Sequence, residues 1–209
     1  MRNKYCLIWM LLFCCLQGTW AQNTVESIRK RYASVKEYIA SHVGTNENDG
    51  AEWAEFYHLE ARQFLPATGG HKEDVYMYWM EREEDKIYPS HYLYFATTKY
   101  NYSDREMYEE YLYDKDGKVA FIYAHDPSWS FGENSEDKEY EFRFYFNKGK
   151  LLKTIIKNRE FEQGDYKDVY SGSTPKSEYA SYCKMLIDKA EKIRLMFIAI
   201  EKEAYNYSE

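Results

Sequence analysis

The residues with the clearest potential for recognition lie between Asp126 and Asp137, in the segment DPSWSFGENSED. Its proline, glycine, serine and asparagine residues predict a loop, but Trp129 and Phe131 are large rings of the kind that anchor a binding partner. The acidic side chains of the segment would form a negative rim around these rings: Asp126, Glu133, Glu136 and Asp137. We therefore predict a binding site made of these six residues. The alternative is that Trp129 folds back as a cover on the edge of the fold.

Metal-ligating residues are present but are not grouped. His58 and Glu60 stand two residues apart, which would place both side chains on one face of a strand, but a metal site needs three or four convergent ligands. The Asp114–Gly117 segment has the spacing of the first residues of a calcium loop. Apolar residues follow it where further oxygen ligands should stand, so a hairpin turn is the better interpretation. We expect no metal ion and no cofactor.

The sequence contains no compact catalytic motif. It has no Gly-x-Ser-x-Gly elbow, no phosphate-binding glycine loop, no His-Glu-x-x-His and no Cys-x-x-Cys. This pattern favours a binding module that performs no catalysis. The alternative is a cell-envelope hydrolase, because 35 acidic residues are enough to provide a pair of carboxylates at the separation that glycosidases use. A structural subunit of an envelope assembly is a third hypothesis.

The first 21 residues have the order of a secretory signal peptide. Two basic residues come first, an apolar run of about a dozen residues follows, and small residues precede Ala21. The run is shorter than the ~20 residues that a transmembrane helix needs. We expect cleavage after Ala21, no transmembrane anchor in the remaining chain, and a location in the periplasm or at the surface of a bacterium. A lipidated Cys14 or Cys15 is the alternative.

The cysteine pattern supports a bacterial rather than a eukaryotic secreted protein. Cleavage after Ala21 would leave Cys183 as the only cysteine, so that no intramolecular disulfide could form. Small secreted domains of eukaryotes are usually held by disulfides. Cys183 lies among apolar residues at helical spacing, which predicts a buried thiol; a nucleophile or an intermolecular disulfide is the alternative.

The charge of the chain limits its partners. Its 28 basic and 35 acidic residues give a formal net charge of −7, which becomes −9 once residues 1–21 are removed. No basic block is present, so we expect no nucleic-acid binding. An acidic exported domain is suited to capture a basic protein, such as a cell-wall hydrolase or a toxin, because opposite charges speed the encounter. A glycan on a tyrosine-rich surface is the alternative ligand.

Hydrophobic periodicity predicts a helix at each end and a sheet between them. Apolar residues recur at steps of three and four over 23–43 and over 175–205, whereas 54–161 alternates with a period of two. Two turns, at 114–117 and 147–149, combine aspartate or asparagine with glycine and indicate hairpins. We predict a single α+β domain: a curved antiparallel sheet of about seven strands with both helices on one face. The other face would be open and rich in tyrosine, available to a sugar or a protein or simply covering a wide sheet.

Overall fold

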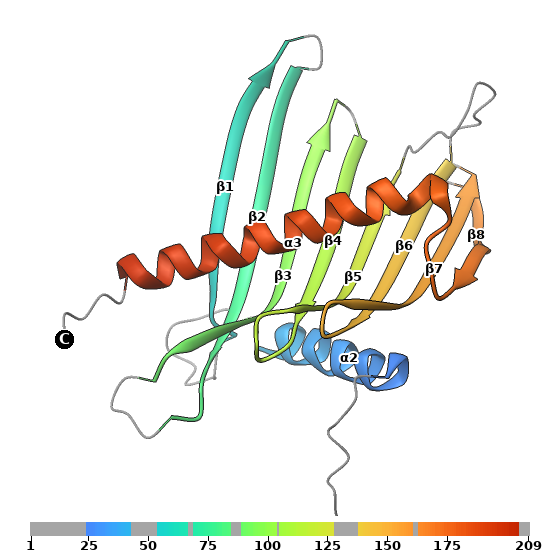
Figure 1. Ribbon diagram of the computed structural model, residues 1–209. Coiled ribbons are helices and arrows are strands. Elements are labelled where there is room, and N and C mark those ends of the chain that lie inside the picture. Colours follow the sequence, from blue (N-terminus) through green and yellow to red (C-terminus); the bar gives the residue numbers. More distant parts are fainter. Residues whose placement is uncertain are drawn as a thin grey trace, which may run out of the picture.

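The computed structural model describes residues 24–42, 54–66, 69–84, 89–103, 105–127, 138–160 and 163–204. These residues form two helices and one eight-stranded sheet (Figure 1). The elements follow one another along the chain as α2 (Val25–Ser41), β1 (Phe56–Leu65), β2 (Gly69–Glu81), β3 (His91–Tyr102), β4 (Arg105–Tyr113), β5 (Val119–Asp126), β6 (Lys138–Asn147), β7 (Lys150–Glu160), β8 (Gln163–Gly172) and α3 (Ser177–Ala204).

The strands are arranged in chain order, and each pairs antiparallel with its neighbours. The sheet is curved and does not close on itself, which confirms the α+β fold class. It has eight strands rather than about seven and extends to Gly172, beyond the expected limit at residue 161. The additional strand, β8, is an edge strand with a polar and largely exposed sequence, so it has no clear apolar alternation.

The two hairpin turns that the sequence indicates are present. In the β4–β5 turn the Asp114 amide donates to the Lys118 carbonyl at 2.8 Å, and Gly117 has a φ of +78°. In the β6–β7 turn Lys148 and Gly149 have φ angles of +49° and +81°. Glycine adopts positive φ without steric cost, and this explains its position at both turns.

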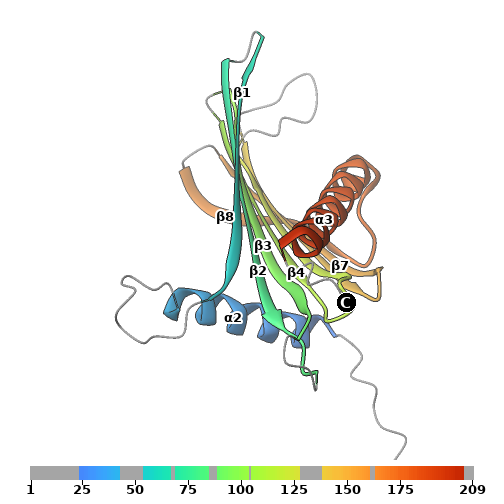
Figure 2. The same ribbon diagram turned by 90° about the vertical axis from the view of Figure 1, so that its left-hand side faces the viewer.

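The expected placement of both helices on one face is corrected by the structure, which has one helix on each face. Figure 2 shows α2 and α3 on opposite sides of the sheet. Ile28 of α2 packs with a cluster that includes Phe95, Leu112, Phe121 and Tyr145. The residues buried on α3 contact the alternate positions of the same strands: Tyr111, Ile122, Phe142, Phe144 and Ile156.

The central strands explain why a helix is needed on each side. Residues 109–113 of β4 are all buried, and Tyr111 and Leu112, which point to opposite faces, are both 0% exposed. Side chains alternate between the two faces of a strand, so a run of consecutive buried residues requires cover on both. The interior of the protein therefore consists of two apolar layers separated by the sheet.

Buried carboxylates accept hydrogen bonds from many of the tyrosine hydroxyls. Glu110 is 2% exposed, and its carboxylate accepts from Tyr32 of α2 and from Tyr108 at 2.7 Å. Lys36 of α2 donates to the same carboxylate at 2.5 Å. A buried carboxylate is stabilised only when charge and hydrogen bonds replace its lost hydration. Glu110 thus attaches α2 to the middle of the sheet.

Replacement of Glu110 by alanine should destabilise the fold strongly. It would leave two tyrosine hydroxyls and one ammonium without their shared acceptor, and we expect a loss of about 2–4 kcal/mol in the free energy of unfolding. Glu106→Ala on the same strand is the matched control, since Glu106 pairs with Lys99 at the surface and should contribute less than about 0.5 kcal/mol. Urea denaturation measures both values. Equal losses would show that the Glu110 contacts do not hold α2.

Candidate functional site

A large cleft lies between α3 and the first three strands, with a volume of about 790 Å³. The β1–β2 hairpin, which contributes to its lining, projects past α3 (Figure 1). It is lined by residues from both sides: Leu59, Glu60, Ala61, His71, Glu73, Val75 and Tyr100 from the sheet, and Ser181, Lys184, Met185, Asp188, Lys189, Lys192, Ile193 and Met196 from α3. We call this the α3 cleft.

The walls of the α3 cleft are mainly apolar. Leu59 and Val75 are paired across β1 and β2 and form the sheet side. Met185, Ile193 and Met196 form the helix side. Leu59, Met185 and Met196 are 37%, 45% and 36% exposed, so a considerable apolar area is open to solvent. A large exposed apolar surface in a concave site is typical of a ligand-binding cleft.

Lys189 is held at the floor of the cleft by two carboxylates. Its Nζ lies 3.1 Å from Glu73 Oε1 and 3.0 Å from Glu109 Oε2, and 3.9 Å from the centre of the Tyr100 ring. Burial, and then the neighbouring Glu109, raise the pKa of Tyr100 well above its usual value. The Tyr100 hydroxyl therefore stays protonated and donates to Glu109 at 2.8 Å. The floor is a network of ion pairs and hydrogen bonds that fixes α3 to the sheet.

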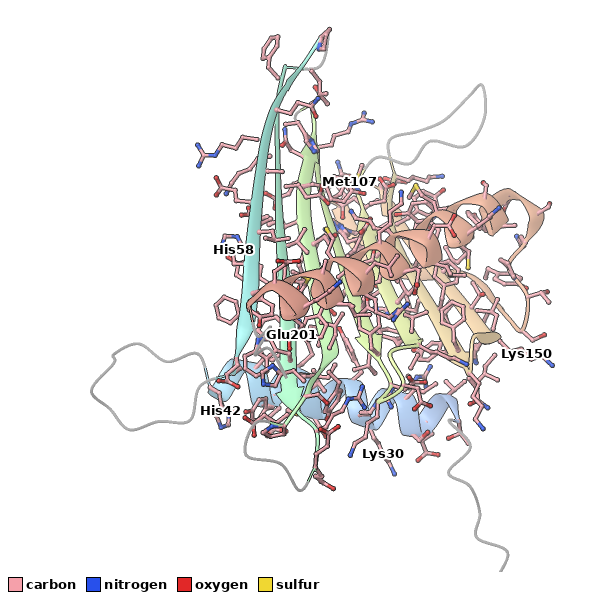
Figure 3. All side chains as sticks on the ribbon, turned by 60° about the vertical axis from the view of Figure 1, so that its left-hand side comes forward. Lys30, His42, His58, Met107, Lys150 and Glu201 are labelled. Atoms are coloured by element: carbon pink, nitrogen blue, oxygen red, sulfur yellow. The ribbon has the colours of Figure 1, made fainter. Side chains whose placement is uncertain are left out.

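A second set of contacts fixes α3 nearer its C-terminal end. Glu201 accepts from the Tyr57 hydroxyl at 2.5 Å, and its other oxygen lies 2.7 Å from His91 Nδ1. Figure 3 shows Glu201 beside the lower part of β1 and β2. The His91 ring lies against Trp79, with the ring centres 4.0 Å apart. Polar contacts thus attach α3 to the sheet at Lys189, in the floor of the cleft, and at Glu201, nearer the C-terminal end of the helix.

The face that carries α2 has a smaller cleft of about 570 Å³. Its lining consists of aromatic and charged residues: Tyr32, Tyr108, Glu110, Phe121, Tyr123, His125, Glu141, Arg143 and Tyr166. Glu141 accepts from Tyr123 at 3.0 Å and lies 2.8 Å from Arg143 Nη2. The predicted tyrosine-rich face was one without a helix; this face is rich in tyrosine but carries α2, and its carboxylates are bound to hydroxyls and cations of the protein itself.

Only one of the six predicted site residues is described. Asp126 is the last residue of β5 and is 3% exposed, so its side chain belongs to the interior. Trp129, Phe131, Glu133, Glu136 and Asp137 lie outside the described residues. The binding role of this group stays a prediction. Across the described ranges, no group of three or more histidine, cysteine or acidic side chains is arranged to hold a metal ion.

His58 and Glu60 have separate partners. The Nε2 atom of His58 lies 2.9 Å from Asp74 Oδ1, and its ring stacks on Tyr76 at 4.3 Å between centres. Glu60 pairs with Arg62 at 2.5 Å. Both side chains therefore take part in contacts within the β1–β2 hairpin.

The sequence contains an indication of the α3 cleft that the helical periodicity does not reveal. Two apolar residues of α3 that line the cleft, Met185 and Met196, lie outside its buried stripe and are 45% and 36% exposed. A helix that needs only one apolar face does not require them. Their excess in the sequence is what marks this helix as part of a site.

No family model, curated protein or solved structure matches this chain. Neither of the described helices is long and apolar enough to cross a membrane. The site is therefore interpreted from its own geometry: an open antiparallel sheet with a helix on each face, and an apolar cleft beneath the C-terminal helix.

The thiol of Cys183 should be inert in the folded protein. It is 4% exposed on the side of α3 that faces the sheet, and burial raises its pKa to about 11. Little thiolate is present at pH 8, and a thiol reagent in solution cannot reach the buried sulfur. In a chain that starts at Gln22, where Cys183 is the only cysteine, we expect no reaction with Ellman's reagent until urea is added. Rapid reaction of the folded protein would instead support a nucleophilic thiol.

Proposed function

We propose that this protein is a binding module without catalytic activity, and that its ligand occupies the α3 cleft. The observation that carries the proposal is the size and character of the cleft. A volume of about 790 Å³ lies within the range of small-molecule sites, and its apolar walls include the exposed side chains of Leu59, Met185 and Met196. Such an area in water is unfavourable unless a ligand covers it.

The use of the carboxylates supports binding rather than hydrolysis. Glu73 and Glu109 both lie against the Lys189 ammonium, and Glu60 lies against Arg62 and Lys72. A hydrolase with paired carboxylates needs one group kept protonated and another free to attack or to activate water. Glu60, Glu73 and Glu109 instead act as structural partners of cations.

Export to the periplasm or the surface of a bacterium is part of the same proposal. It is supported by the order of basic, apolar and small residues over 1–21. Capture of a basic protein by the segment from Asp126 to Asp137 is supported by the acidity of the chain and by the two rings of that segment.

Binding of Nile red, an uncharged apolar dye, tests the cleft directly. We expect a saturable rise in fluorescence with one site per chain. Met185→Asp should weaken binding at least ten-fold, because it places a charge on the apolar wall. Leu195→Asp is the matched control: Leu195 is 52% exposed on the same helix and is not among the lining residues, so binding should change less than two-fold. Absence of saturable binding, or equal loss in both variants, would contradict the proposal.

A further inference from the structure

We propose that the ligand of the α3 cleft is a single-chain amphiphile with one anionic head group, such as a long-chain carboxylate. The apolar chain would lie between α3 and the sheet, and the head would lie at Lys184 or Lys192 on the outer edge of the helix. This inference rests on the proposed function, because it assigns a ligand class to the same cleft.

The shape of the apolar wall fits an extended chain. Met185 and Met196 are 11 residues apart on α3, which corresponds to about 16 Å along a helix axis. Ile193 lies between them, and Leu59 and Val75 face them from the sheet side. An elongated strip of this length suits a long unbranched chain better than a compact ring system. The flexible thioethers of the two methionines can also adjust to chains that differ in detail.

The charged groups inside the cleft already have partners. Glu73 shares the Lys189 ammonium with Glu109, and Glu60 lies 2.5 Å from Arg62 and 3.3 Å from Lys72. His71 Nδ1 lies 2.6 Å from the Asn101 carbonyl oxygen. A charged head group at Glu60, Glu73 or Lys189 would therefore compete with an existing contact.

The outer edge of α3 provides the remaining charges. Lys184, Asp188 and Lys192 follow one another at four-residue spacing, all three are exposed, and none forms an ion pair with another of the described residues. Two ammonium groups and one carboxylate give this outer edge a formal excess of one positive charge, whereas Glu73, Glu109 and Lys189 at the floor carry a formal excess of one negative charge. The positive excess beside an apolar strip is complementary to an anionic amphiphile and not to a cationic one.

Competition against Nile red distinguishes the contribution of the ligand's head group to binding from that of its apolar chain. Oleate and oleyl alcohol have the same chain and differ in the charge of the head, and both are used below the concentration at which they aggregate. We expect oleate to displace the dye from the full mature chain at one molecule per protein and at least ten-fold more effectively than oleyl alcohol. Raised salt should reduce this preference, because the lysines are exposed.

Two double variants test whether Lys184 and Lys192 bind the anionic head group. Lys184→Gln/Lys192→Gln should abolish the preference for oleate and leave the affinity for oleyl alcohol unchanged. Lys115→Gln/Lys202→Gln removes the same total charge from exposed positions outside the cleft, and should retain the preference. Circular dichroism confirms that each variant folds.

The outcomes distinguish this inference from the proposed function. If Nile red binds but oleate and oleyl alcohol compete equally, the ligand does not need an anionic head group. The proposal that the α3 cleft binds an apolar ligand is then retained. If the control pair loses the preference as fully as the lysine pair of the cleft, the attraction comes from overall charge and the assignment fails. If oleate binds only as aggregates or as part of an anionic vesicle, a single-molecule ligand is excluded.

Discussion

The whole structure depends on a sheet whose central strands are apolar on both faces. Tyr111 and Leu112 are neighbours in β4, point to opposite sides and are both fully buried. Water must therefore be excluded from both faces, and one helix cannot do this. The N-terminal and C-terminal helices each cover one side, but a single helix is narrower than eight strands. Among the described residues part of each face is not covered by a helix, and the cleft beside α3 is one such opening.

Two consecutive glutamates reinforce this arrangement. Glu109 and Glu110 are buried on opposite faces of β4. Glu109 accepts hydrogen bonds from tyrosines of the sheet and pairs with Lys189 of α3. Glu110 accepts hydrogen bonds from Lys36 and Tyr32 of α2. Each helix is thus attached to the same strand by a charged contact as well as by apolar packing. Because a buried carboxylate needs its partners, these contacts also fix the position of each helix on its face. The wall of the α3 cleft is therefore built in advance of any ligand.

Much of the fold could be predicted from the sequence, because its signals are local. Periodicity gives the two helices, and turn chemistry at Gly117 and Gly149 gives the hairpins and hence the order of the strands. The placement of the helices was not predicted, because the alternation of Phe142 and Phe144 with Glu141 and Arg143 suggests a single apolar face. The continuous apolar runs at 111–113 and 119–122 carry the opposite signal, since they indicate strands that are buried on both faces. The cleft depends on which residues from distant elements meet, and periodicity holds no information about that.

The central claim is that the ligand lies on the α3 side of the sheet, and methionine methyl NMR tests it most directly. Met185 and Met196 line the α3 cleft, whereas Met80 packs with the cluster on the α2 side. With 13C-methyl-methionine and a nitroxide-labelled stearate, the methyl signals of Met185 and Met196 should broaden first, and the Met80 signal should keep its width. Broadening of Met80 to the same extent, or unchanged signals from Met185 and Met196 at saturating probe, would place the ligand elsewhere or exclude it.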